Sequence, residues 1–190
     1  MILGLTGSIG MGKSTTAEMF RDAGVPVWDA DAVVRRLYSP GGPAGPALEA
    51  AFPGSVRADG HVDRDALRAL IAEDPSVLDR INAVVHPMVA EDRARFLTAH
   101  DGLVVLDVPL LFETGLEAAC DAVAVVSTDA DEQRARVLSR GTMTEADLDA
   151  ILSRQVPDAE KRARADYIIP TDTMEGARAA VAAILEELHA

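Results

Sequence analysis

The chain has 190 residues, with 18 basic and 31 acidic side chains and a formal net charge of −13 at pH 7. Its composition is 48% hydrophobic and 26% charged, which is enough apolar material for one folded domain and excludes wholesale disorder. The acidic excess argues against a protein that binds nucleic acid through a broad basic surface. It leaves anionic small molecules possible, because a few arginines and backbone N–H groups can hold a phosphate.

The sequence shows neither a targeting segment nor a set of cysteines that could form disulfides. Cys120 is the single cysteine, so no internal disulfide is expected. No apolar run approaches the roughly 18 residues of a membrane helix, and no positively charged leader precedes an apolar stretch. We expect a cytoplasmic protein without a membrane or nucleic-acid partner.

The first predicted strand, residues 2–5, runs into a glycine-rich loop and then a helix over residues 13–23. The loop matches G-x-x-x-x-G-K-[ST], a pattern expected by chance about once in a thousand such chains. Its backbone N–H groups would surround phosphates, Lys13 would reach the β- and γ-phosphates, and Ser14 would ligate Mg²⁺. Thr15 would contact the α-phosphate. The predicted ATP-binding residues of the loop are Gly7, Ser8, Ile9, Gly10, Met11, Gly12, Lys13, Ser14 and Thr15.

The second predicted strand, residues 25–28, is followed by two aspartates. Asp29 and Asp31 would lie at a strand's carboxyl end, where a carboxylate can accept the proton of an attacking hydroxyl. Both could instead serve the next helix, Asp29 as its N-cap and Asp31 in its first turn. Spacing alone does not choose between these interpretations, although Asp29 resembles a helix cap more closely than Asp31 does.

About 70 residues separate the second strand from the third, far more than an ordinary crossover. The segment opens with the turn-rich sequence from Ser39 to Pro43 and then becomes helical, with an apolar stripe from Val77 to Val85. Pro87 suits the first turn of a further helix. We expect a helical lobe at the edge of the sheet.

The third and fourth predicted strands, residues 103–106 and 122–126, are continuous apolar runs typical of strands covered on both faces. Asp107 follows the third strand and could hold Mg²⁺ through a water or anchor the turn at Pro109. The single asparagine, Asn82, is followed by alanine, so the N-K-x-D motif of a GTPase is missing. No glutamate follows Asp107, as a motor-type ATPase would usually require. A small kinase remains.

Arginines gather between Arg134 and Arg164 in a segment with helical spacing. An arginine that closes over the γ-phosphate would stabilise the charge of the transferring group, and a lid would exclude water. A solvated helix face with acidic partners explains several of these arginines equally well. The fifth strand, residues 167–169, is predicted to stop at Pro170, and residues 174–188 form a helix with one apolar face.

Four stretches together resemble dephospho-CoA kinase, and the resemblance covers the whole chain. They are Leu5 to Ser14, Asp29-Ala30-Asp31 with Arg35, His86-Pro87, and Asp107 to Glu113. That family moves the γ-phosphate of ATP to the ribose 3′-hydroxyl of dephospho-CoA, the last step of coenzyme A synthesis. The resemblance implies ATP and dephospho-CoA as substrates and Mg²⁺ as the metal.

Carried over position by position, the resemblance makes Asp31 the catalytic base, with Lys13 and Arg140 stabilising the transferred phosphoryl group. Arg140 and Arg154 match lid arginines that bind ATP. The implied acceptor-binding residues are Asp31, Arg35, His86, Leu110, Leu111 and Phe112. From the residues alone, His86 could simply end a helix before a proline, and Leu110 to Phe112 could be ordinary core.

The expected fold is therefore α/β, a three-layer P-loop kinase with a five-stranded parallel sheet and helices on both faces. The resemblance implies the strand order 2-3-1-4-5. We expect one domain over 1–190, with its core at 1–34, 101–133 and 163–190, an acceptor lobe at 35–100 and a lid at 134–162. The family's N-D-G turn after the fifth strand is replaced here by Thr171-Asp172-Thr173. The alternatives are a non-catalytic nucleotide-dependent switch and a kinase for another small acceptor.

Overall fold

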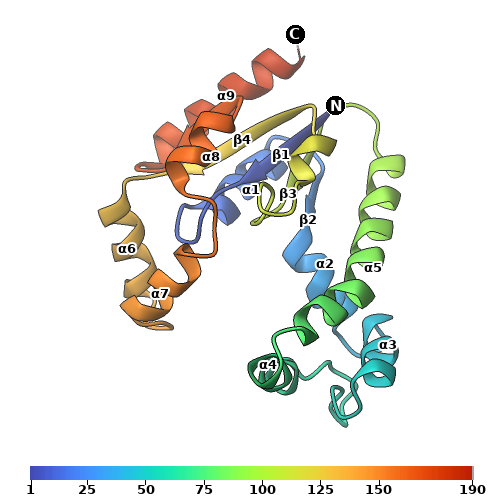
Figure 1. Cartoon of the computed structure of the whole chain (residues 1–190). Coiled ribbons are helices and arrows are strands. Elements are labelled where there is room, and N and C mark those ends of the chain that lie inside the picture. Colours follow the sequence, from blue (N-terminus) through green and yellow to red (C-terminus); the bar gives the residue numbers. More distant parts are fainter. Residues whose placement is uncertain (190) are drawn as a thin grey trace. The chain divides into compact units, whose positions relative to one another are not determined.

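A five-stranded parallel sheet in the order β2-β3-β1-β4-β5 organises the computed structural model, which describes residues 1–189 (Figure 1). The five predicted strands are confirmed, and so is the order implied by the resemblance. The strands are β1 (Ile2–Thr6), β2 (Val27–Asp29), β3 (Val104–Asp107), β4 (Ala122–Ser127) and β5 (Tyr167–Pro170).

The inner strands β3, β1 and β4 are buried except at Ile2, the first residue of β1, because helices cover both faces of the sheet. Every residue of β3 and β4 is buried, as expected for parallel strands made of aliphatic residues. On one face, Leu3 and Leu5 join a core with α1 (Lys13–Asp22) and α9 (Met174–His189). On the opposite face, Gly4 lies against Leu111 and Cys120. Helix α8 (Asp158–Arg164) packs on β4.

The sequence predicts that the fifth strand stops before Pro170. This prediction is wrong by one residue, because β5 includes Pro170. The N–H of Thr171 donates to Ser127 O on β4 at 2.9 Å. In a parallel ladder alternate residues donate to the same neighbour, so the nitrogen of Pro170 points to the open edge and no ladder bond is lost.

Two further helices follow β4 and pack against each other: α6 (Ala130–Ser139) and α7 (Glu145–Leu152). Both begin at capping side chains. Asp129 accepts from the N–H of Glu132 at 2.8 Å, and Thr144 forms a capping box with Asp147, which satisfies N–H groups left open at a helix start. These helices occupy about half of the predicted lid, residues 134–162.

By its internal contacts the chain divides into two compact units. Unit 1 consists of residues 1–29 and the chain from His100 onward, and contains the sheet. Unit 2 is Ala30–Ala99. It contains α2 (Ala30–Leu37), α3 (Ala44–Ala51), α4 (Arg64–Glu73) and α5 (Val77–Ala99), and α5 contacts the other three helices.

The prediction that Pro87 starts a new helix is wrong, because α5 is continuous through it. Ala83, whose carbonyl loses its hydrogen bond at the proline, is exposed, so that carbonyl can bind water instead. Val77, Ile81 and Val85 supply the buried side of α5. The interpretation of His86 as a helix end is wrong for the same reason.

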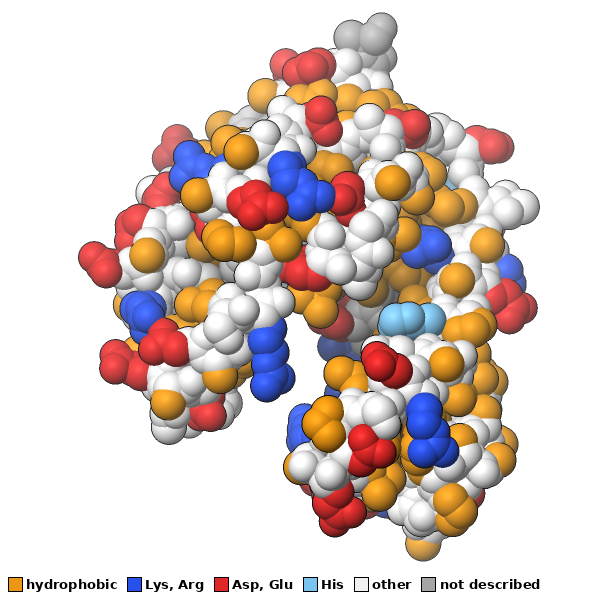
Figure 2. All heavy atoms as spheres, viewed as in Figure 1, with side chains coloured by type: hydrophobic (Ala, Val, Ile, Leu, Met, Phe, Trp, Pro, Cys, Tyr) orange, Lys and Arg blue, Asp and Glu red, His pale blue; other side chains and the backbone are white. Residues whose placement is uncertain are grey.

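The surface agrees with the charge balance of the sequence. On the face shown in Figure 2, Lys and Arg side chains are scattered among Asp and Glu and form no broad basic area. Within residues 1–189, none of the helices combines the length and apolar character that a membrane span would need.

Candidate active site

The glycine-rich loop joins β1 to α1, as the sequence predicts. Its glycines are required for different structural reasons. A side chain at Gly7 would lie 2.3 Å from a methyl group of Val126, so the close approach to β4 requires glycine. Gly10 and Gly12 have φ values of 82° and 90°, in the left-handed region that other residues rarely adopt. Gly12 is also the N-cap of α1, whose open N–H groups and positive dipole end favour an anion.

Lys13 and Asp107 form an ion pair at the carboxyl end of the central strands. Lys13 Nζ lies 2.6 Å from Asp107 Oδ1, and the two side chains are 14% and 3% exposed. Asp107 is in register with Leu5 of β1 and with Asp29 of β2. The pair therefore fixes the ammonium group of the loop lysine beside the strand ends.

Side chains from three later segments and one backbone N–H group hold the loop in place. Gln133 donates to Ile9 O at 2.7 Å, and Gln155 accepts from the N–H of Ile9 at 3.3 Å. Thr171 donates to Met11 O at 2.7 Å. The Met11 side chain is buried in the core, and its sulfur accepts from the N–H of Thr128. Met11 thus packs inward, although it is bulky for a loop position.

A cavity of about 230 Å³ lies beside this loop in unit 1. Arg140 lines it together with Gly10, Gly12 and Thr15 of the loop region. The remaining lining residues are Thr16, Met19, Arg136, Thr171, Asp172, Thr173, Met174 and Ala177. The segment that replaces the family's N-D-G turn therefore forms one wall of a cavity at the phosphate loop.

Sequence reasoning missed the role of Arg136 and Thr171 in this wall. Arg136 donates to both oxygens of Thr171, to Oγ1 at 3.2 Å and to the carbonyl at 2.7 Å. Arg136 stood out only as one arginine among several, and no motif distinguishes it. Met174, the first residue of the helix predicted to have one apolar face, is half exposed and lines the cavity.

The predicted lid arginines differ in their positions. Arg140 is the C-cap of α6 and borders the cavity, whereas Arg154 is exposed and lies outside the cavity lining. Ser14 and Thr15 are exposed at the start of α1, and Ser8 is buried. The structure thus brings Arg140 to the loop and leaves Arg154 apart.

The segment Leu110 to Phe112 is divided between core and surface. Leu111 is fully buried and Phe112 nearly so, while Leu110 is 42% exposed. Arg164 lies over the Phe112 ring, 4.4 Å from its centroid. Only Leu110 therefore has a free apolar surface for a ligand.

Directly after this segment, Glu113 forms a buried ion pair with α8. Its Oε1 lies 2.9 Å from Lys161 Nζ and accepts from the N–H of Val156 at 2.8 Å. Burial acts to raise the pKa of Glu113, but Lys161 and the backbone N–H groups outweigh it and leave the pKa below its usual range. Sequence reasoning assigned Lys161 no role.

The acceptor-side residues lie on unit 2. Asp31 is exposed in the first turn of α2, two residues after β2, and Arg35 is exposed one turn later. Asp29 by contrast is the last residue of β2 and is half-buried. His86 is exposed on α5.

Comparison with known proteins decides the family. The dephospho-CoA kinase family model matches residues 1–175. The dephospho-CoA kinase of Jannaschia sp. (strain CCS1) is 60% identical over 188 residues, which are 98% of this chain and 96% of that protein. The chain belongs to the dephospho-CoA kinase family.

Solved structures share the fold of this chain. The crystal structure of TT1252 from Thermus thermophilus has a TM-score of 0.88 at 35% identity and covers 99% of this chain and 97% of its own. A dephospho-CoA kinase from Campylobacter jejuni shares the fold, with a TM-score of 0.72 at 21% identity over 98% of this chain and 96% of its own. As a member of the family, the chain is an ATP-dependent kinase that phosphorylates an alcohol group of dephospho-CoA.

Proposed function

We propose that the groups described above divide the reaction between ATP binding by unit 1 and acceptor activation by Asp31. The observation that carries the proposal is the complete phosphate loop between β1 and α1, with Lys13 held at its base by Asp107. The loop N–H groups and the α1 N-terminus would bind the phosphates of ATP. Lys13 would then exchange Asp107 for the β- and γ-phosphate oxygens.

The cavity beside the loop is the proposed site of the ATP nucleoside. Arg140 borders both the loop and this cavity, so its guanidinium can reach phosphate oxygens and stabilise charge that spreads over the γ-phosphoryl group. Arg154 is proposed as a second ATP-binding arginine on the family pattern alone. Gln155, which now accepts from Ile9 N–H, would release that donor to a phosphate.

The residues present fit a magnesium ion bound mainly through ATP. Mg²⁺ in phosphoryl-transfer sites is held by one or two protein oxygens together with phosphates and waters. Ser14 offers an exposed hydroxyl at the start of α1, and Asp107 offers a carboxylate at the end of β3. Within residues 1–189 no cluster of three His, Cys, Asp or Glu side chains could hold a metal by itself. Bound there, Mg²⁺ would neutralise the β- and γ-phosphate charge.

On the acceptor side, Asp31 would take the proton of the ribose 3′-hydroxyl as its oxygen bonds to the γ-phosphorus and the bond to ADP breaks. Its exposure leaves the carboxylate accessible to a substrate. Arg35 and His86 are proposed to bind dephospho-CoA through polar contacts, and Leu110 through its exposed apolar surface. Leu111 and Phe112 would act from the core by holding Leu110 in position.

A product assay tests this function directly. Purified protein is incubated with Mg-ATP and, separately, dephospho-CoA, AMP, other nucleoside monophosphates or gluconate, and the products are identified by mass spectrometry. We expect 3′-phosphorylated product with dephospho-CoA alone. Phosphorylation of another acceptor instead would reject the substrate, and ATP binding without any acceptor-dependent product would favour the nucleotide-dependent switch.

The choice between the two aspartates has its own test. Asp31→Asn removes the proposed base and should lower turnover about 10²–10⁴-fold, with little change in ATP affinity. Asp29→Asn is the matched control, because it alters a neighbouring carboxylate at the strand end. Turnover and nucleotide titration are compared for both. Equal turnover of Asp31→Asn and the wild type would reject the base assignment.

A further inference from the structure

Unit 2 contains a cavity of about 600 Å³, and among its lining residues only Arg35 has been given a role so far. Four arginines line it: Arg35, Arg57, Arg64 and Arg68. They are a quarter of the 16 arginines of the chain, since 18 basic residues include two lysines. Tyr38, the residue after α2, lies in the same wall. Two carboxylates, Asp59 and Asp65, also line the cavity, so its lining has an excess of two positive charges in a chain of net charge −13.

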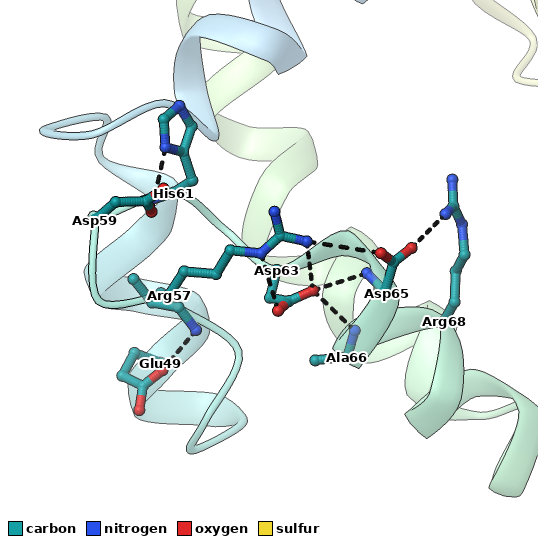
Figure 3. A network of polar contacts seen from close by, with 9 residues as sticks. Glu49, Arg57, Asp59, His61, Asp63, Asp65, Ala66 and Arg68 are labelled. Atoms are coloured by element: carbon teal, nitrogen blue, oxygen red, sulfur yellow. Dashed lines mark hydrogen bonds and ion pairs between the residues drawn. The ribbon is translucent and has the colours of Figure 1, made fainter.

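Two of these arginines are held in place by carboxylates, as Figure 3 shows. Arg57 donates to both oxygens of Asp63 at 3.0 and 3.1 Å, and Asp65 accepts from Arg68 at 2.7 Å. Asp63 also caps α4 by accepting from two backbone N–H groups. Arg57 and these N–H groups lower the pKa of Asp63 to about 2, so the network keeps its charges at neutral pH.

Arg64 differs from its neighbours. It lies over the Tyr38 ring, 5.2 Å from the centroid, and within the described residues no carboxylate lies within ion-pair distance of it. It is the first residue of α4, where the positive end of the helix dipole disfavours a cation. The Tyr38 ring stabilises the guanidinium in part, and a bound anion would supply the opposite charge that no carboxylate supplies here.

The cavity is linked to the proposed base through α2. Arg35 is four residues after Asp31 on that helix, so the two residues lie on the same face, about 6 Å apart along the axis. In a nucleoside 5′-diphosphate ester, the 3′-hydroxyl and the 5′-phosphate are carried by one ribose ring. A hydroxyl at Asp31 therefore places the diphosphate within reach of Arg35 and the cavity behind it.

We propose that this cavity binds the 5′-diphosphate of dephospho-CoA, with Arg64 as the arginine that pairs with it directly and Arg57 and Arg68 as fixed cations around it. The proposal rests on the proposed function and names the part of the acceptor that unit 2 recognises. Guanidinium groups suit this task because they form paired, charge-assisted hydrogen bonds with phosphate oxygens.

Arg64→Met tests the proposal, with Arg80→Met as its matched control. Arg80 is an arginine of the same unit that also lies over an aromatic ring, 4.7 Å from the centroid of Phe52, but it does not line the cavity. Arg64→Met should raise KM for dephospho-CoA about 10-fold or more, while KM for ATP and turnover at saturation stay close to wild type. Arg80→Met should leave all three unchanged.

Fragments of the acceptor can be used as inhibitors. They distinguish a variant that has lost only the phosphate contact from one in which the structure of unit 2 is disturbed. Against dephospho-CoA, 4′-phosphopantetheine should inhibit the wild type more strongly than pantetheine, and Arg64→Met should remove most of that difference. Thermal unfolding should show Arg64→Met as stable as the wild type, because Arg64 is exposed at an unfavourable helix position. If Arg64→Met nevertheless unfolds, Arg68→Gln provides the same comparison.

The outcomes distinguish this proposal from the function it rests on. A wild-type protein that forms no product from dephospho-CoA overturns the proposed function. An active wild type with equal KM for dephospho-CoA in Arg64→Met and Arg80→Met overturns the diphosphate site alone. A KM increase that is equal for dephospho-CoA and ATP also overturns it.

Discussion

Unit 1 and unit 2 use charged side chains in different ways. In unit 1, Lys13 pairs with Asp107 and Lys161 with Glu113, and none of these four side chains is more than 14% exposed. In unit 2, the side chains of the Arg57 network are between 27% and 74% exposed. Both lysines of the chain belong to the buried pairs. The two lysine pairs of unit 1 and the Arg57 network of unit 2 therefore contribute differently to stability, although unit 1 also has exposed pairs such as Arg134 with Asp149.

The physical reason is solvation. Removing one partner from a buried pair leaves the other charge without water or counterion, whereas an exposed partner is simply rehydrated. The comparison teaches that the buried pairs of unit 1 support the fold, while the exposed arginines are available for ligands. Each of the following predictions tests that division, and they run from the largest expected effect to the smallest.

Arg140→Met should lower turnover about 10²–10³-fold, because the proposed charge stabilisation of the transferred phosphoryl group is lost. It should leave thermal stability unchanged, since Arg140 is exposed. Arg134→Met is the control: Arg134 is on the same helix and pairs with Asp149 outside the cavity. Turnover and melting temperature are measured for both. Equal activity of the two variants would contradict the role of Arg140.

Lys161→Met should lower the free energy of unfolding by about 3 kcal/mol, because Glu113 is left buried and unpaired. Chemical denaturation measures this, with Arg162→Met as an exposed neighbour on the same helix. The double variant Lys161→Met with Glu113→Leu removes both charges and should recover part of the loss. A Lys161→Met variant as stable as Arg162→Met would show that burial does not determine how much this ion pair contributes to the free energy of unfolding.

The pH dependence of stability should reveal Glu113. Its folded-state pKa is lowered, so its contribution is present above the unfolded value of about 4.3 and is lost as the pH falls through the folded pKa. The difference in urea midpoint between wild type and Glu113→Gln should therefore be greatest near neutral pH and shrink below about pH 4. If the difference in urea midpoint grew as the pH fell, the lowered folded-state pKa of Glu113 would be rejected.

Arg57→Met should have the smallest effect on stability, because the pair with Asp63 lies in solvent. Its change in urea midpoint should be well below that of Lys161→Met and should shrink further when NaCl screens the pair. Denaturation at low and high salt measures both. A loss as large as that of Lys161→Met would remove the contrast between the two units.

Local patterns predicted much of the fold because they act through near neighbours. The run Ala122 to Val126 is apolar without alternation, which is typical of a strand covered on both faces, and β4 is fully buried. The glycine positions of the phosphate loop follow from backbone geometry. Pro87 shows the limit, because an exposed proline within a long packed helix is tolerated when neighbouring helices stabilise the rest of α5.

The cavity walls could not be read from the sequence. Arg136 and Thr171 are separated by 35 residues, and Ile9 and Gln155 by 146. Leu110 and Leu111 look alike in the sequence, yet one is exposed and the other buried. Such differences depend on which distant segment covers a residue, and no spacing rule contains that information.

The sequence by itself determined the strand–loop–helix unit, the phosphate chemistry of Gly7 to Ser14 and the resemblance to one kinase family, because each depends on residues close together in the chain. Only the tertiary structure decided that Arg140 borders the cavity while Arg154 does not, and that both lysines are buried in ion pairs. It also gathered Arg35, Arg57, Arg64 and Arg68 around one cavity. These are matters of burial and long-range contact, which arise only when the chain packs.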